Sequence, residues 1–214
     1  MCGRYVSRAD AALEREWQLL PNQFEFDTHY DVRPTTQVPI VRLTDEGREC
    51  VSVRWGLVPH WAKGKPGKYA TFNARTEGMQ QAASYRGPWK NGKRCLFPVL
   101  GFFEWQALEG NNKQKWYITL PKQQTFALAG LWECSDDLES ATICTVDANP
   151  LMAKIHNKRK RMPLILDPKD YDTWLADDND KAEKVIRKYP AARMQAWPVT
   201  RTSANDPRCI EQES

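Results

Sequence analysis

The chain has 214 residues, of which 41% are hydrophobic and 27% charged, and its formal net charge is +4. These proportions are those of a globular protein with a substantial core, and they exclude a wholly disordered chain. No apolar run approaches the roughly 18 residues that cross a bilayer, and the first ten residues lack the basic and apolar regions of a signal peptide. We therefore expect a cytoplasmic protein with no membrane contact, whose mildly basic charge permits nucleic-acid binding without requiring it.

The first predicted element is a helix from Ser7 to Leu20. Ser7 and Asp10 have the spacing of a capping box, and Pro21 would end the helix. Its apolar face would comprise Leu13, Trp17 and Leu20.

Alternating strands dominate the rest of the chain. The segments Gln37–Leu43 and Glu49–Trp55 flank the turn Thr44–Gly47, which predicts a hairpin. An exposed basic loop is expected at Pro59–Lys68. Further strands are expected at 94–99, 116–120, 125–133, 141–146, 162–166 and 194–199.

Two aspartate or asparagine residues before prolines predict helix starts. Asn149 and Pro150 would begin a short helix ending near His156, and Asp167 with Pro168 would begin another that carries Tyr171, Trp174 and Leu175. A further helix would hold Ala182, Val185 and Ile186, and a polar tail follows from about residue 203. The predicted class is α+β: a β-rich single domain over residues 1–214, with largely antiparallel sheets and a few peripheral helices.

The six cysteines form no CxxC pair, so we expect neither a zinc site nor another metal or cofactor. Five of them are expected to be reduced and mostly buried. Cys2 is different, because removal of Met1 would leave it with both a free α-amine and a thiol. A nearby cation can lower the pKa of that thiol, and Arg4 could supply one.

A 1,2-aminothiol reacts characteristically with an aldehyde. The amine forms an imine, and the thiol then closes onto the same carbon to give a thiazolidine ring. A ring-opened abasic deoxyribose presents such an aldehyde. Cys2 followed by Gly3 also fits an amino-terminal nucleophile hydrolase, since glutamine amidotransferases of that class begin with Cys-Gly, and a cysteine at position 2 can be incidental.

Several motifs, in order along the chain, distinguish these interpretations. They are Met1-Cys2-Gly3-Arg4-Tyr5, Trp55-Gly56-Leu57-Val58-Pro59, Phe72-Asn73-Ala74-Arg75-Thr76-Glu77, Arg94-Cys95-Leu96, Gly101-Phe102-Phe103-Glu104-Trp105, and His156 with Arg161-Met162-Pro163. With this set the sequence resembles the SRAP family, the SOS-response-associated peptidases, and glutamine amidotransferases do not show it.

The resemblance implies a bacterial abasic-site protein that forms a thiazolidine cross-link with single-stranded DNA and prefers single-strand to duplex junctions. It implies a monomer that removes its own Met1, hence the peptidase label, and it leaves room for lyase-like reversal. Carried over by motif, the catalytic residues are Cys2, Asn73, Glu104 and His156. Arg4, Arg75 and Arg161 match arginines that contact the DNA backbone. A cysteine peptidase acting on other proteins and a non-covalent single-strand binder stay open as alternatives.

The side chains of the three further catalytic candidates suit such chemistry. Glu104 lies between Phe103 and Trp105, where a carboxyl group could act as a general acid–base, although a surface glutamate on a strand is the alternative. The amide of Asn73 could orient the Cys2 amine, or it could be a turn residue. His156 could transfer a proton near neutral pH, or it could simply end a helix.

Basic and aromatic residues predict how a single strand would be bound. Five basic residues occur in Lys154–Arg161, and among them Lys158 is a candidate DNA contact. Trp61 could stack on bases or pack in the core. The chain also departs from the family pattern: the loop Asn157–Lys160 is longer, Ala62 replaces a second tryptophan, and Asp31 replaces an asparagine.

Overall fold

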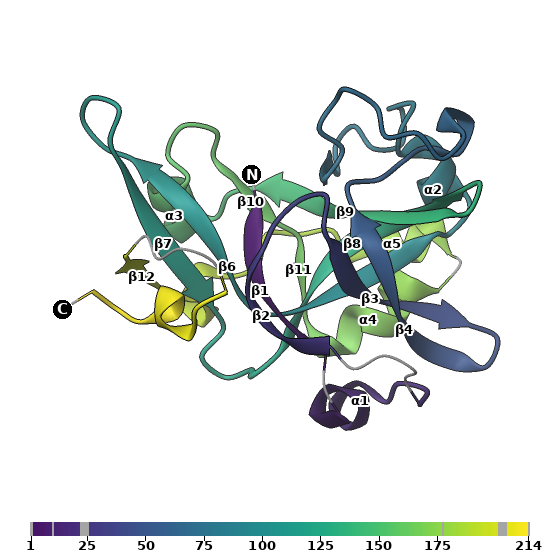
Figure 1. Cartoon of the computed structure of the whole chain (residues 1–214), viewed down its shortest axis with the longest axis horizontal. Coiled ribbons are helices and arrows are strands. Elements are labelled where there is room, and N and C mark those ends of the chain that lie inside the picture. The colour runs from purple at the N-terminus through teal and green to yellow at the C-terminus, as the bar shows by residue number, and fades with distance from the viewer. Residues whose placement is uncertain (1, 10, 22–25, 177, 201–204, 214) are drawn as a thin grey trace.

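The computed structural model describes residues 2–9, 11–21, 26–176, 178–200 and 205–213. These residues form a 12-stranded, mostly antiparallel sheet system with short helices at its periphery (Figure 1). The α+β, β-rich class predicted from the sequence is confirmed. No helix within the described ranges is long and apolar enough to cross a membrane.

Five strands close into a barrel. They are β3 (Gln37–Thr44), β4 (Gly47–Trp55), β6 (Arg94–Ala107), β8 (Phe126–Ser135) and β9 (Leu138–Asp147). The pairs β3–β4, β3–β6, β6–β8 and β8–β9 are antiparallel, and the parallel pair β4–β9 completes the ring. Because the ring is closed, each of these strands has a paired neighbour on both sides within the barrel.

A second antiparallel sheet grows from the far half of β6. Here β6 pairs with β1 (Arg4–Ala9) on one side and with β7 (Lys113–Thr119) on the other. Outside them lie β2 (Phe26–Val32) next to β1 and β12 (Gln195–Val199) next to β7. The long strand β6 therefore belongs to both the barrel and the second sheet, and residues 102–103 lie between β1 and β7.

Shorter elements complete the structure. The strands β5 (Asn73–Arg75) and β10 (Arg161–Pro163) both pair with β9, while β11 (Ile165–Leu166) pairs with β8. The helices are α1 (Ala11–Trp17), α2 (Arg86–Lys90), α3 (Pro150–Ile155), α4 (Tyr171–Leu175) and α5 (Asn179–Lys184). The 3-10 turns are η1 (His60–Ala62), η2 (Pro168–Asp170), η3 (Ala191–Arg193) and η4 (Pro207–Ile210).

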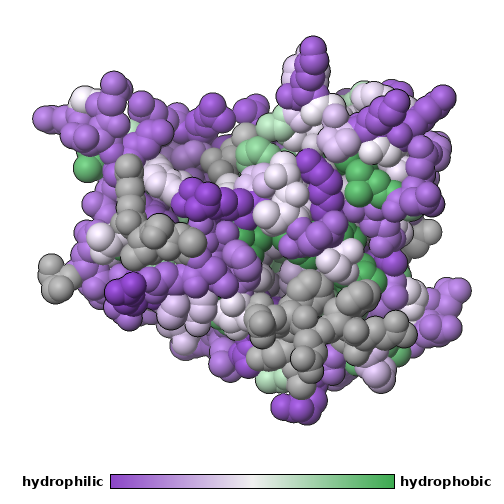
Figure 2. Space-filling model, viewed as in Figure 1, coloured by the Kyte–Doolittle hydropathy of each residue, from purple (hydrophilic) through white to green (hydrophobic). Residues whose placement is uncertain are grey.

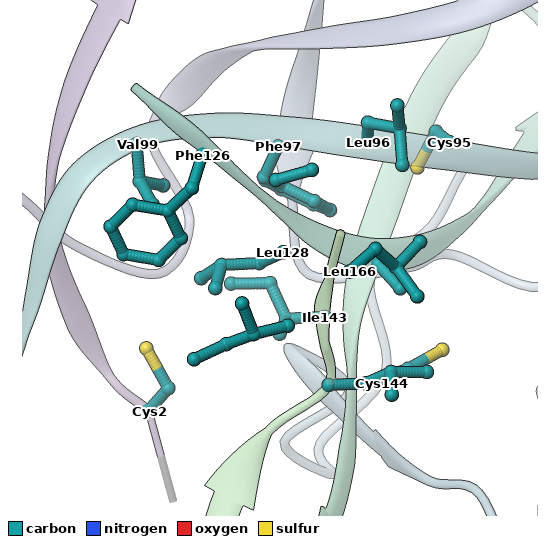
Figure 3. Packing of buried hydrophobic residues seen from close by; sticks show 14 of the residues in the cluster. Cys2, Cys95, Leu96, Phe97, Val99, Phe126, Leu128, Ile143, Cys144 and Leu166 are labelled. Carbon is teal, nitrogen blue, oxygen red and sulfur yellow. The ribbon is translucent and has the colours of Figure 1, made fainter. Parts of the chain in front are cut away.

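The main core fills the barrel and reaches the amino terminus. Phe97, Phe126, Leu128 and Ile143 are fully buried there, and Cys2 lies among them (Figure 3). A smaller cluster lies on the second sheet and comprises Val6, Phe103, Tyr117, Val199 and Cys209.

Several sequence predictions are confirmed. The hairpin is formed by β3 and β4 in continuous register from Gln37–Arg54 to Thr44–Gly47. Asn149 caps α3, since its Oδ1 accepts a hydrogen bond from the Met152 amide at 2.9 Å. Of the other predicted strands, β6 is much longer than expected, and the expected strand 162–166 is instead two short strands, β10 and β11, which pair with β9 and β8.

The predicted start of the first helix is wrong. Ser7 lies in β1, where it pairs with His29 of β2 and Val99 of β6, so it cannot be the N-cap of a capping box. The helix proper is α1, ending at Trp17, and Asp10 lies outside the described residues. Pairing with two distant strands overrides the local helical spacing.

The described part of the expected polar tail packs against the second sheet. Cys209 in η4 is 1% exposed, and the Trp197 indole donates to the Ile210 carbonyl at 2.8 Å. Residues 201–204 lie outside the described ranges.

Gly130 in β8 provides a test of barrel packing. A Cβ at this position would lie 2.5 Å from Phe97 and 2.6 Å from the Thr142 carbonyl oxygen, which belongs to the backbone of β9. We expect Gly130→Ala to lower the free energy of unfolding by about 1–3 kcal/mol, measured by urea denaturation. Gly67→Ala, whose Cβ would have no atom within 4 Å, is the control. Equal stability of the two variants would contradict this packing.

Candidate active site

Cys2 lies just before β1 and is fully buried. Figure 3 shows its side chain directed toward the barrel core, with Val99, Phe126 and Ile143 nearby. The thiol donates a long 3.8 Å hydrogen bond to the carbonyl oxygen of Arg4. Cys2 is therefore held in one place by the core and by the start of β1.

Burial raises the pKa of the Cys2 thiol well above its ordinary value, and the negative charge of Glu104 raises it further. The expected lowering by the Arg4 cation is wrong. The Arg4 guanidinium instead lies 3.5 Å from Asp31 and 5.5 Å from the Trp105 ring centroid, and it is the Arg4 backbone that contacts the thiol. The thiol is thus protonated at neutral pH while Met1 is attached, and it needs a base to react.

Asn73 is directed at the backbone of Cys2. Its Nδ2 donates to the Cys2 carbonyl oxygen at 2.8 Å, and the hydroxyl of Tyr85 donates to the Asn73 carbonyl at 3.1 Å. Asn73 belongs to β5 and pairs with Ile143, so it is not a turn residue. Among the described residues, the buried Oδ1 of Asn73 has no hydrogen-bond partner, so it is available as an acceptor.

Glu104 and His156 face each other in the interior. Glu104 is 2% exposed, so the alternative of a surface glutamate is wrong. The Nε2 atom of His156 lies 4.0 Å from Glu104 Oε2. Its Nδ1 lies 3.0 Å from the Arg161 carbonyl oxygen and 3.3 Å from the Arg161 amide nitrogen. Nδ1 can donate to the carbonyl or accept from the amide, so the imidazole is held in position in either tautomer.

Arg161, which the sequence suggested as a DNA contact, is hydrogen-bonded to several groups of the protein itself. Its guanidinium donates to both carboxylate oxygens of Glu77, at 2.7 and 2.9 Å, to Asp147 at 2.8 Å and to the Thr145 carbonyl at 2.7 Å. The side chain is 6% exposed, whereas those of Glu77 and Asp147 are more than half exposed. Glu77 lies within one of the recognised motifs, but Asp147 carried no sequence signal, because only the pairing of β9 with β10 brings it here.

A pocket of about 340 Å³ opens beside Glu104 and His156. Its remaining lining residues are Trp105, Ala107, Lys113, Lys158 and Arg159. The candidate DNA contact Lys158 therefore lies at the mouth of the space that reaches Glu104. Within the described ranges, no group of His, Cys, Asp or Glu side chains is arranged to hold a metal ion.

Two further candidate DNA contacts, Trp61 and Arg75, lie on the surface. Trp61 is 65% exposed, so the alternative of a core tryptophan is wrong, and nearby Tyr69 is 88% exposed. Arg75 is exposed at the end of β5, two residues from Asn73. Hydrophilic side chains cover most of the face shown in Figure 2.

Comparison with known proteins decides the family. The family model described as SOS response associated peptidase (SRAP) matches residues 1–205. The chain belongs to the SRAP family. It is 33% identical to the abasic site processing protein YoqW of Bacillus subtilis over 97% of this chain and 96% of that protein. It is also 33% identical to the abasic site processing protein HMCES of Gallus gallus, over 76% of this chain and 57% of that protein.

Solved structures share the SRAP fold of this chain. A protein from Bacteroides thetaiotaomicron superposes with a TM-score of 0.87 at 26% identity, covering 100% of both chains. One from Bordetella bronchiseptica gives 0.82 at 25% identity, covering 93% of this chain and 100% of that one.

The SRAP motifs divide into those at the site and those that support it. Trp55 packs against the Tyr5 ring at 5.1 Å and donates to the Phe72 carbonyl at 2.9 Å, next to Asn73. Arg94 is 1% exposed and donates to the Trp174 carbonyl at 2.6 Å, so it anchors α4 to the barrel. Both residues support the fold through these contacts.

The raised pKa of Cys2 predicts slow alkylation. A higher pKa means less thiolate at any given pH, so in folded protein that retains Met1 we expect Cys2 to react with iodoacetamide at least about tenfold more slowly than the partly exposed Cys134 at pH 8. The rate should still rise with pH above 8. Mass spectrometry of the labelled peptides gives both rates, and urea-unfolded protein is the control. Equal labelling in the folded state would contradict the burial of Cys2.

Proposed function

We propose that this SRAP protein captures abasic sites in single-stranded DNA as a covalent thiazolidine adduct of Cys2. The observation that carries the proposal is the position of Glu104. This buried carboxylate acts electrostatically on the Cys2 thiol, faces His156 Nε2 at 4.0 Å and lines the basic pocket. The relatives named abasic site processing proteins support a DNA lesion as the substrate.

The first step is removal of Met1. Hydrolysis of the Met1–Cys2 peptide bond consumes one water, releases methionine and leaves a free α-amine on Cys2. Because the pKa of the buried thiol is raised, the thiol needs a base, and Glu104 is the carboxylate that acts on it. Asn73 holds the Cys2 carbonyl during this step through its 2.8 Å hydrogen bond.

The second step is capture of the aldehyde. The α-amine adds to the first carbon of the ring-opened sugar, and water leaves to give an imine. The sulfur then bonds to the same carbon while the imine nitrogen gains the thiol proton, which closes the thiazolidine. In this proposal Asn73 Oδ1 accepts from the α-amine, Glu104 protonates the departing hydroxyl, and His156 exchanges protons with Glu104. The same steps in reverse release the DNA.

The DNA strand would lie across the pocket mouth. Lys158 and Arg159 line that mouth, Arg75 is exposed near Asn73, and Trp61 offers a ring for a base to stack on. For Arg161 to bind a phosphate, the phosphate would have to replace Glu77 or Asp147. Arg161 also serves the reaction by holding His156 through its backbone.

The decisive test is a denaturing gel of the protein with a single-stranded oligonucleotide that carries one abasic site. We expect a shifted band that survives denaturant in wild type and in Cys134→Ala, and no such band in Cys2→Ala. Absence of the band in wild type lacking Met1 would exclude the thiazolidine. Cys2-dependent cleavage of an unrelated protein would instead favour a peptidase, and binding unaffected by Cys2→Ala with no adduct would favour a simple binder.

The role of Glu104 can be tested separately. Glu104→Gln keeps the shape of the side chain but removes its acid–base function, so we expect adduct formation to slow by about a hundredfold or more. Removal of Met1, followed by mass spectrometry, should slow as well. Glu109→Gln, in the exposed turn between β6 and β7, is the control. Unchanged rates for Glu104→Gln would remove Glu104 from the mechanism.

A further inference from the structure

A second group of charges lies across the sheet from Glu104. Arg4 pairs with Phe103 in the ladder between β1 and β6, and Phe103 precedes Glu104. Because side chains alternate along a strand, Arg4 and Glu104 point to opposite faces of the second sheet. The face that carries Arg4 takes no part in the chemistry described above.

A buried carboxylate, that of Asp31, organises this face. Its side chain is 7% exposed, and its two oxygens contact two different arginines. Nε and Nη2 of Arg33 both donate to Oδ2, with Nε at 2.8 Å. Oδ1 lies 3.5 Å from Arg4 Nε and has no hydrogen-bond partner in the described part of the chain, so its contact with Arg4 is an ion pair without a hydrogen bond.

Lys115 adds a third cation to the group. It is 3% exposed, and its Nζ lies 3.9 Å from the Phe103 ring centroid. Burial lowers its pKa, Asp31 opposes this, and the charges of Arg4 and Arg33 lower it further. The group therefore contains three cationic side chains, those of Arg4, Arg33 and Lys115, and one carboxylate, that of Asp31. Among these four residues positive charge is in excess.

The two arginines keep donors that solvent can reach. The side chain of Arg33 is 50% exposed and that of Arg4 is 30% exposed. The backbone carbonyl of Arg33 accepts a 2.8 Å hydrogen bond from the Thr36 hydroxyl, which holds the turn after β2. Two partly exposed guanidinium groups on one carboxylate are suited to receiving a phosphate group.

This cluster is continuous with the reaction pocket. The Trp105 ring lies 5.5 Å from the Arg4 guanidinium and also lines the pocket beside Glu104. Arg4 is two residues from Cys2 along the chain. A DNA strand bound at Cys2 could therefore extend over Trp105 to Arg4 and Arg33.

We propose that Arg4 and Arg33, which share the carboxylate of Asp31, together bind one backbone phosphate of the DNA strand next to the captured sugar. The proposal rests on the proposed function, which supplies the DNA strand. Arg33 is then a second phosphate ligand, and Asp31 weakens phosphate binding by competing for both arginines.

Equilibrium binding of an intact single-stranded oligonucleotide without an abasic site tests this proposal apart from the covalent step. Fluorescence anisotropy over a series of salt concentrations gives affinity and salt slope. Loss of one phosphate contact in Arg33→Ala should weaken binding several-fold at low salt and reduce the slope by about 0.7. Asp31→Asn removes the competing charge and should tighten binding about threefold.

The matched control is Arg193→Ala. Arg193 is 48% exposed and is paired with a single carboxylate, that of Asp167, much as Arg33 is paired with Asp31. If the Asp31–Arg33 pair were only structural, Arg33→Ala and Asp31→Asn would both bind DNA more weakly. If it is a phosphate site, Arg33→Ala lowers the affinity and Asp31→Asn raises it. The proposal is overturned if Arg33→Ala has the same DNA affinity as Arg193→Ala, or if it binds more weakly with an unchanged salt slope. Weaker DNA binding by Asp31→Asn also overturns it.

The two proposals fail in different ways. If wild type forms no denaturant-stable adduct with abasic DNA, the proposed function fails whatever the anisotropy shows. If the adduct forms but Arg33→Ala binds intact DNA like the control, only the phosphate site fails.

Discussion

The site depends on the pairing of β1 with the second half of β6. That register, from Arg4–Phe103 to Val6–Gly101, brings the residues just before β1 to the level of Glu104. Phe103, the residue before Glu104, pairs with both β1 and β7, and Glu104 itself is opposite Trp116 of β7, so backbone ladders fix its position. The distance between the amino terminus and the carboxylate is therefore set by main-chain hydrogen bonds, which are far stiffer than a side chain on a loop.

The same arrangement explains why several polar groups are buried within a small volume. Asn73, Glu104, His156 and Arg161 are each less than 9% exposed. Burying such groups costs free energy unless partners compensate, and a charge without a partner costs most. Arg161 is compensated by Glu77 and Asp147, and its backbone holds His156. Asn73 and Arg161, which are remote in sequence, lie beside the same strand because β5 and β10 both pair with β9.

The two faces of the second sheet carry different electrostatics. Glu104 gives its face a buried negative charge, whereas Arg4 and Lys115 give the opposite face a positive one. Because side chains alternate along a strand, only the thickness of the sheet separates the Glu104 carboxylate from these cations. Trp105, which lines the pocket, also contacts Arg4. Acid–base chemistry and binding of a polyanion can thus lie close together without the arginines neutralising the carboxylate.

Local signals in the sequence predicted local structure well. The hairpin of β3 and β4 follows from alternation around a short turn, and α3 follows from Asn149 before Pro150. The same kind of reasoning misplaced Ser7, whose helical spacing to Asp10 was overridden by strand partners more than 20 and 90 residues away. It also missed β2, β5 and α2, whose short segments carry little periodicity of their own.

By itself, the sequence determined the β-rich class, the family through its ordered motifs, and Cys2, Asn73, Glu104 and His156 as candidate catalytic residues. Tertiary structure alone decided that the Cys2 thiol is buried with a raised pKa, that Trp61 is exposed, and that Arg161 and Arg4 have carboxylate partners. The physical reason is that residue type and spacing specify which chemistry is possible. Burial and charge proximity arise instead from contacts between strands that are remote in sequence, and these contacts set the protonation and accessibility of each group.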